Sequence, residues 1–251
     1  MSIIQPLILK ALHCRPWPKQ SFTLPKIQSH RGLCISSIQE NTLDSFRAAK
    51  QKGAEMVECD LRLSRDGVPV VCHDETIERI SGKVGVVSDM TAKELKLQAN
   101  IPTLEQCLTD QSTPNFWNLE IKSSFFLNEE LEQKVAEVVY KVNANRRVII
   151  SSFNPGSISR MEEFLPNVPR ALLVTQEDHP KNRIWLKEMW AAPFLSFHML
   201  NLDYRMVDGE IYRKLMEKQI KFAVWTVNGK TEVSKYLRLG AASIISDDWL
   251  N

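Results

Sequence analysis

Apolar, β-rich runs alternate with amphipathic stretches along the 251-residue chain, from about residue 25 to its end. Such alternation is typical of βαβ units with parallel strands. The expected strands are Lys26–His30, Glu55–Leu63, Pro69–His73, Phe116–Lys122, Arg147–Ser152, Arg170–Thr175, Leu195–Leu202, Lys221–Val227 and Ser243–Ser246. The expected helices are Thr42–Lys52, Leu104–Thr109, Glu129–Asn143, Gly156–Phe164, Arg183–Trp190, Gly209–Lys218 and Lys230–Leu239, with Asn41 as the N-cap of the first.

One connection is too short for parallel strands. Only residues 64–68 separate the second run from the third, whereas a parallel crossover takes a dozen or more residues. Asp66-Gly67 within this connection is a strong hairpin signal. We therefore expect an antiparallel hairpin arm at about residues 58–73. The other eight runs then match a single TIM-type (β/α)8 barrel, an α/β fold of about 250 residues.

The domain organisation that we expect is one barrel, residues 25–251, preceded by an N-terminal extension, residues 1–24. Ile3–His13 is apolar enough to form a helix that packs on the barrel, either beside the last strand or across the barrel floor. A membrane-spanning helix needs about 20 apolar residues, and no window of the sequence provides them. The N-terminal stretch also lacks the basic start and cleavage site of a signal peptide.

Charge and cysteine content exclude several classes of protein. The chain has 32 Lys and Arg against 30 Asp and Glu, so a nucleic-acid binder that works through a basic face is excluded. Five cysteines form no Cys-x-x-Cys pair, which disfavours a zinc or disulfide framework. Cys59 and Cys72 lie in apolar runs, so we expect buried, reduced thiols and a cytoplasmic protein.

Carboxylates are expected to gather at the carboxyl ends of the strands. Glu58 and Asp60 lie two residues apart on one strand, so both face the same side. Glu120 lies on the next barrel strand. Unpaired carboxylates that are packed together repel one another, and a divalent cation relieves the repulsion. Ligation by oxygen alone indicates Mg²⁺ or Ca²⁺ rather than zinc.

Cationic and titratable residues join these carboxylates. Arg31 and Lys122 provide positive charge that suits a phosphoryl group. A turn near Asp66 opposes residues whose numbers sum to about 132, which brings His73 close to the carboxylates. His30 and His73 are then two groups that can act as general acid and base. Each motif alone is commonly structural, but together they indicate cleavage of a phosphate ester.

At these residues the sequence resembles the glycerophosphodiester phosphodiesterase family, over about residues 26–248. The matching segments are His30-Arg31-Gly32, Glu40-Asn41-Thr42, Gly53-Ala54, Glu58-Cys59-Asp60, Ser64 through Asp74, Ile101 through Glu105, Leu119-Glu120-Ile121-Lys122, Ser151-Ser152-Phe153, Trp225 through Asn228 and Ile244 through Asp247. The resemblance implies a TIM-type barrel that hydrolyses glycerophosphodiesters to sn-glycerol 3-phosphate and an alcohol, with Mg²⁺ or Ca²⁺ as cofactor.

The resemblance also implies roles for individual residues, carried over by motif. It assigns His30 and His73 as the acid/base pair, Glu58, Asp60 and Glu120 as metal ligands, Arg31 and Lys122 as phosphate contacts, Phe153 and Trp225 as pocket walls, and Glu40 and Asp74 as residues that orient Arg31 and either the metal or His73. Plain barrel packing is the alternative for the two aromatic residues. The sequence does not determine which histidine is the acid, or whether the attacking group is the glycerol hydroxyl or water.

Some features depart from the family pattern and leave an alternative open. Gln39 stands where many members have Pro, and only Glu75–Asn100 separates two motifs between which many members carry an inserted domain. The mouth of the barrel should therefore be more open. Ser123–Leu127 and Leu186–Phe197 are rich in apolar residues that could hold an acyl chain. The alternative function is then a lysophospholipase D acting on lysophospholipids.

A phosphate-binding protein without activity is disfavoured, because the two histidines, three carboxylates and two cations are all present. His13, His179 and His198 lie outside the motifs and are expected to be surface or packing residues. The expected partner is a small glycerophosphodiester. The alcohol group, the preferred cation and the oligomeric state do not follow from the sequence.

Overall fold

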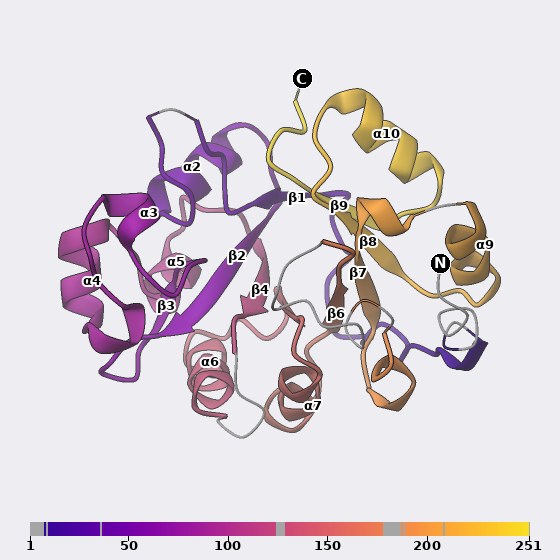
Figure 1. The fold of residues 1–251 in the computed structure, drawn as a ribbon, viewed down its shortest axis with the longest axis horizontal. Coiled ribbons are helices and arrows are strands. Elements are labelled where there is room, and N and C mark those ends of the chain that lie inside the picture. The colour runs from indigo at the N-terminus through magenta and orange to yellow at the C-terminus, as the bar shows by residue number, and fades with distance from the viewer. Residues whose placement is uncertain are drawn as a thin grey trace.

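Eight parallel strands close into a barrel in the computed structural model of the protein (Figure 1). The structure describes residues 8, 10–35, 37–123, 129–177, 187, 189–207 and 209–250. The strands in ring order are β1 (Ile27–His30), β2 (Met56–Leu63), β4 (Phe116–Ile121), β5 (Val148–Ser152), β6 (Arg170–Val174), β7 (Met199–Asp203), β8 (Phe222–Trp225) and β9 (Ser243–Ser246). Because β1 pairs with both β9 and β2, the ring is closed, and the prediction of a TIM-type barrel is confirmed.

Helices surround this barrel (Figure 1). They are α2 (Leu43–Gln51), α5 (Leu104–Thr109), α6 (Glu130–Lys141), α7 (Pro155–Phe164), α9 (Gly209–Glu217) and α10 (Lys230–Arg238), with short 3₁₀ turns η1 (Val87–Asp89), η2 (Ala192–Phe194) and η3 (Tyr204–Met206). Most of the expected helix Arg183–Trp190 lies outside the described residues. No helix in the described ranges is long and apolar enough to cross a membrane.

The hairpin arm forms as predicted. β3 (Pro69–Val71) runs antiparallel to β2, and its register pairs Leu61 with Val71 and Leu63 with Pro69, so paired residue numbers sum to 132. The arm has a small apolar core of its own, formed by Val70, Cys72, Ile77, Val87, Leu95, Ala99 and Ile101. Two helices that the sequence analysis did not predict, α3 (Glu78–Ser81) and α4 (Ala92–Ala99), complete this part of the molecule.

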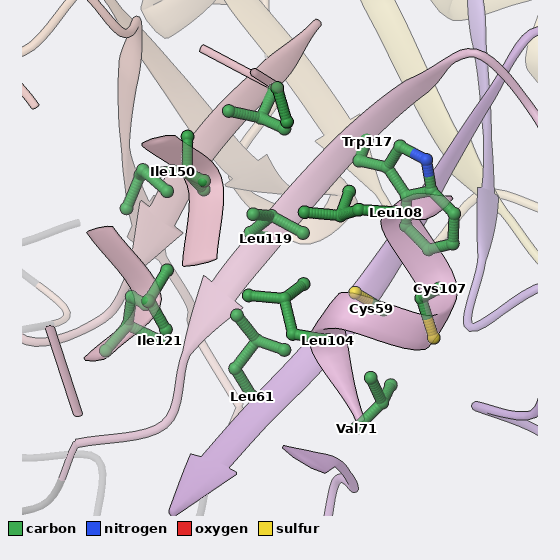
Figure 2. Close-up of a cluster of buried hydrophobic side chains, with 14 of the residues drawn as sticks. Cys59, Leu61, Val71, Leu104, Cys107, Leu108, Trp117, Leu119, Ile121 and Ile150 are labelled. Atoms are coloured by element: carbon green, nitrogen blue, oxygen red, sulfur yellow. The ribbon is translucent and has the colours of Figure 1, made fainter. Parts of the chain in front are cut away.

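The main core lies between the barrel and its helices. Outward-facing side chains of β2 and β4, among them Cys59 and Leu119, pack against Leu104 and Cys107 of α5 (Figure 2). Their neighbours along each strand face inward, because successive side chains of a strand point to opposite sides. Cys59, Cys72 and Cys107 are buried and all five cysteines are free thiols, as expected. Burial thus fixes which side of β2 and β4 faces the barrel interior.

The floor of the barrel is apolar and is covered by the N-terminal segment. Leu24 packs against inward-facing residues at the start of five strands, namely Met56, Ile149, Ala171, Met199 and Ala223. Phe22 stacks on Phe116 with 4.4 Å between ring centroids. Most of the expected helix Ile3–His13 lies outside the described residues, but Leu12 is buried in the core beside α9. The boundary between extension and barrel at residue 25 stays a prediction.

The loop from β1 to α2 corrects one detail of the sequence analysis. The N-cap of α2 is Thr42 and not Asn41, because Thr42 accepts a hydrogen bond from the backbone N–H of Ser45. Asn41 has a left-handed backbone, with φ of 56°, and its side chain points to the barrel mouth. Gly32, with φ of 82°, packs so closely on α2 that an added Cβ would meet backbone and side-chain atoms of Ser45. This contact holds the loop that carries Arg31.

His198, just before β7, is a packing residue, as expected from its position outside the motifs. It is buried, with 6% of its surface exposed, and its Nδ1 accepts a hydrogen bond of 3.0 Å from the backbone N–H of Arg170. Burial, together with the charge of Arg170, lowers the pKa of His198 from 6.5 to about 4. The neutral ring is therefore part of the folded structure.

We predict that His198→Asn flattens the pH dependence of stability between pH 7 and pH 5. The unfolded chain binds a proton at His198 near pH 6.5 and the folded chain only near its lowered pKa, so acid favours unfolding. This residue should contribute about 2 kcal/mol to the loss of unfolding free energy over that range. Asn keeps a hydrogen-bond acceptor but does not titrate. Urea unfolding at both pH values measures the effect.

The matched control is His13→Asn, since His13 is exposed. This control should retain the wild-type pH dependence. An equal acid-induced loss in wild type and His198→Asn would contradict the assignment of His198 as a buried neutral group.

Candidate active site

Three carboxylates meet at the carboxyl-end mouth of the barrel. Asp60 of β2 is paired in register with Glu120 of β4, and Glu58 precedes Asp60 on the same inward face. Their side chains are almost fully buried, and one oxygen from each lies within 4.8 Å of the other two. The predicted convergence of Glu58, Asp60 and Glu120 is therefore present. Such crowding of acidic groups must be balanced by positive charge or protons.

Two positively charged side chains balance the charge on part of this cluster. Lys122 Nζ lies 3.0 Å from Asp60 Oδ1 and 2.5 Å from Glu120 Oε1. Arg31 Nε lies 3.2 Å from Asp60 Oδ2, which also accepts a 2.8 Å hydrogen bond from Asn41. Burial opposes ionisation of Asp60, but the charges of Lys122 and Arg31 outweigh it and lower the pKa. Asp60 is thus held as a carboxylate.

Among the described residues, Glu58 is the member of the cluster that forms no ion pair with a lysine or an arginine. Burial, and then the neighbouring charge of Asp60, raise its pKa to about 8. Its Oε2 accepts a hydrogen bond from the backbone N–H of Arg31 at 3.3 Å. Its buried Oε1 accepts no hydrogen bond from any residue in the described ranges. The ionised form of this carboxyl group therefore lacks a compensating positive charge, which either a proton or a bound cation would provide.

The donor set fits a divalent cation. All three groups offer oxygen, which Mg²⁺ and Ca²⁺ prefer. Oxygens on opposite sides of such an ion lie roughly 4–5 Å apart, given bond lengths of about 2.1–2.6 Å, and the separation limit of 4.8 Å in this cluster is compatible with that span. Glu58, Asp60 and Glu120 could therefore hold one divalent cation, and Glu58 Oε1 would gain the partner that it needs.

His30, at the end of β1, lies beside Glu58. Its Nε2 is 3.8 Å from Glu58 Oε2, and its Nδ1 is 2.6 Å from Asp247 Oδ1. Asp247 is itself fixed by Asn228, which donates to its carboxylate at 3.2 Å and accepts from its backbone N–H. Burial lowers the pKa of His30, but the hydrogen bond with Asp247 and the charge of Glu58 outweigh it, so the pKa is raised.

His73 is held at the end of the hairpin arm. Its Nδ1 lies 2.6 Å from Asp74 Oδ1, and its backbone carbonyl accepts hydrogen bonds of 2.9 and 2.7 Å from Arg62. The preceding Cys72 donates its backbone N–H to the carbonyl of Asp60, which fixes the arm against the carboxylate cluster. Each histidine therefore has Nδ1 engaged by an aspartate, and its other ring nitrogen could transfer a proton.

The sequence analysis assigned no role to several residues that complete the site. Asp247 and Asn228 follow β9 and β8 respectively, and their place at strand ends was the signal that could have identified them. Asn41 was interpreted as a helix cap. Glu40 and Asp74, in contrast, lie where expected, since Glu40 Oε1 is 3.2 Å from Arg31 Nη1 and Asp74 contacts His73.

Two aromatic side chains stand at the same mouth. Phe153 and Trp225 pack edge to face with 5.6 Å between ring centroids, and Lys122 Nζ lies 5.9 Å from the centre of the Phe153 ring. Lys122 also lines a cavity of about 620 Å³, which opens between the end of β2, η1 and the start of α6. The site therefore has an aromatic wall and an adjoining open space.

The fold and the site together define a TIM-barrel hydrolase that acts on phosphoric diesters. The model of the glycerophosphoryl diester phosphodiesterase family matches residues 30–250. A glycerophosphodiester phosphodiesterase of Caldanaerobacter subterraneus subsp. tengcongensis is 31% identical over 234 residues, which cover 88% of this chain and 93% of that protein. One from Bacillus altitudinis is 30% identical over 89% of this chain and 95% of its own length. The chain belongs to this family and is a glycerophosphodiester phosphodiesterase.

Solved structures agree with the barrel. The glycerophosphodiester phosphodiesterase of Thermotoga maritima superposes with a TM-score of 0.68 at 26% identity, over 91% of this chain and 96% of that one. A phosphodiesterase of Oleispira antarctica in complex with the product sn-glycerol-3-phosphate gives a TM-score of 0.71 at 24% identity, over 89% and 93% of the two chains. The latter identity is low enough that it supports the fold alone.

We predict that Glu58→Gln weakens binding of Mg²⁺ or Ca²⁺ by more than about tenfold, since even residues outside the ligand set commonly contribute that much. Gln keeps the shape of the side chain but removes its charge. Isothermal titration of the protein with each cation measures the affinity. The control is Glu105→Gln, a half-buried residue of α5 whose partner is Lys141. Equal affinities in wild type and Glu58→Gln would contradict a cation site here.

Proposed function

We propose that the chain hydrolyses glycerophosphodiesters to sn-glycerol 3-phosphate and an alcohol, with one divalent cation, Mg²⁺ or Ca²⁺, and with His30 and His73 as the general acid–base pair. The observation that carries the proposal is that each histidine has its own aspartate on Nδ1, at 2.6 Å, beside one buried carboxylate cluster. The match to the glycerophosphoryl diester phosphodiesterase family over residues 30–250 supports this substrate class.

Each residue has a defined task in the proposed reaction. Arg31 and Lys122 contact the phosphate oxygens and balance their charge. One histidine removes the proton of the attacking hydroxyl, whose oxygen forms a bond to phosphorus. The other gives a proton to the alcohol oxygen as its bond to phosphorus breaks. Glu58, Asp60 and Glu120 would hold a divalent cation, which would stabilise negative charge on the phosphoryl group.

Two courses are open to the attacking hydroxyl, and the residues serve both. If the hydroxyl belongs to the glycerol part, a cyclic phosphate forms, and water then opens it with the two histidines in exchanged roles. If the hydroxyl belongs to water, sn-glycerol 3-phosphate forms directly. Phe153 and Trp225 are proposed to form one wall of the substrate pocket, because their paired rings border Lys122.

The cavity beside Lys122 favours a second candidate function. Its volume of about 620 Å³ exceeds what a small alcohol fills, and Leu63, Val87 and Leu131 contribute apolar surface to it. This supports a lysophospholipase D activity, in which the same headgroup alcohol is released but the glycerol part of the substrate carries an acyl chain that the cavity could hold. Of the segments first considered for an acyl chain, residues 124–127 and 186 lie outside the described residues, as does 188.

We predict that His30→Ala and His73→Ala each lower kcat on glycerophosphocholine by roughly 10²–10⁴-fold, the usual contribution of a general acid or base. Both rings are held by exposed or partly exposed aspartates rather than by the core, so the fold should persist. Steady-state release of choline measures kcat, and circular dichroism checks folding. A folded variant with a near-normal rate would remove that histidine from the mechanism.

We also predict that the rate on glycerophosphocholine exceeds the rate on lysophosphatidylcholine. Both activities should vanish in chelator and return with Mg²⁺ or Ca²⁺, because the cation site serves either substrate. Choline release from both compounds, assayed with each cation, measures the preference. A faster reaction with the lysophospholipid would favour the second function, and undiminished rates in chelator would contradict the role of the cation.

A further inference from the structure

Arg79 lies outside every role assigned so far, yet it links two parts of the site. It belongs to α3, in the segment that connects the hairpin arm to β4. Its Nη2 lies 2.6 Å from Glu40 Oε1, and its Nε lies 2.5 Å from Asp74 Oδ2. These two carboxylates come from positions 34 residues apart in the chain. One guanidinium group therefore bridges them.

Each of the two carboxylates also contacts a residue with a proposed role in the reaction. Glu40 Oε1 also contacts Arg31 Nη1, at 3.2 Å. Asp74 uses its second oxygen, Oδ1, to contact His73 Nδ1, at 2.6 Å. The order of contacts is thus Arg31, Glu40, Arg79, Asp74 and His73, in which the two arginines alternate with the two carboxylates. Arg79 therefore connects Arg31, the proposed phosphate contact, with His73, the proposed acid or base.

Anchoring of α3 does not account for these contacts. The segment is already fixed by Ile77, which is fully buried in the core of the hairpin arm. The backbone of Ile77 also donates to Gly85, and Thr76 pairs with Val86. Exposed ion pairs add little stability in general. The contacts of Arg79 therefore serve the active site more than the stability of the fold.

We infer that Arg79 is a positioning residue of the phosphodiesterase reaction. Its planar guanidinium, with donors in a fixed arrangement, sets the carboxylate of Asp74 against His73 and the carboxylate of Glu40 against Arg31 at the same time. Loss of Arg79 frees both carboxylates to rotate toward water. The orientation of His73 and the placement of Arg31 are then lost together. The inference rests on the proposed function, since it takes His73 as an acid or base and Arg31 as a phosphate contact.

The test compares Arg79→Met in two backgrounds. In the wild-type background we expect kcat on glycerophosphocholine to fall by about 10–100-fold, as for other partners that orient a working residue, and KM to rise. In the His73→Ala background the further change in kcat should be less than about twofold, because the ring to be oriented is absent. The effects of the two substitutions on kcat are then not additive. The rise in KM should remain, because the contact through Glu40 does not pass through His73.

Arg47→Met is the matched control. Arg47 also bridges two carboxylates, Asp44 at 3.2 Å and Asp110 at 2.6 Å, and is about as exposed as Arg79. It lies on α2 away from the site, so kcat and KM should stay at wild-type values. Unfolding in urea, measured for all variants, reports any general loss of structure.

Three results would overturn the inference. They are a wild-type kcat in Arg79→Met, an equal loss of kcat in both backgrounds, which marks a structural role, or an unchanged KM, which removes the contact through Glu40. Failure of the wild-type chain to hydrolyse any glycerophosphodiester would be a different result, because it rejects the proposed function itself.

Discussion

The burial of three carboxylates at the barrel mouth is the constraint on which the rest of the site depends. Isolated, ionised carboxylates are costly to remove from water, and here Glu58, Asp60 and Glu120 share one small volume. Lys122 forms ion pairs with Asp60 and Glu120 and Arg31 forms one with Asp60, while Glu58 Oε1 has neither an ion pair nor a hydrogen-bond donor in the described part of the chain. The Glu58 oxygen that has no donor among the described residues makes the cluster a candidate site for a cation.

The fold delivers the two histidines to this cluster by different means. His30 ends a barrel strand, so its position follows from closure of the ring between β9 and β2. His73 ends the hairpin arm, so its position follows from the turn at Asp66-Gly67 and from the backbone bond between Cys72 and Asp60. Both rings are then oriented by an aspartate at Nδ1. The same local solution is reached from a barrel strand and from an arm outside the barrel.

Local patterns in the sequence were enough to predict much of the fold and part of the site. The short link before Pro69 required a hairpin, and alternation along β2 placed Glu58 and Asp60 on one face. The capping box of Thr91 and Glu94 was also a local signal for α4, although it was overlooked. Partners that meet only through the tertiary fold were not predictable: Asp247 lies 217 positions from His30, and Arg79 is an exposed residue with no distinguishing pattern. Asn41 suits a helix cap by residue type, but its left-handed backbone turns it to Asp60 instead.

The covered floor of the barrel determines where substrate enters and where products leave. Leu24 and Phe22 close the end opposite the carboxylate cluster with apolar side chains, so the interior is blocked at that end. A substrate enters, and the phosphate and alcohol products leave, through one doorway at the carboxyl ends of the strands. The side chains at the carboxyl ends of the strands, and not those of the floor, are therefore the ones that an entering substrate and a departing product meet.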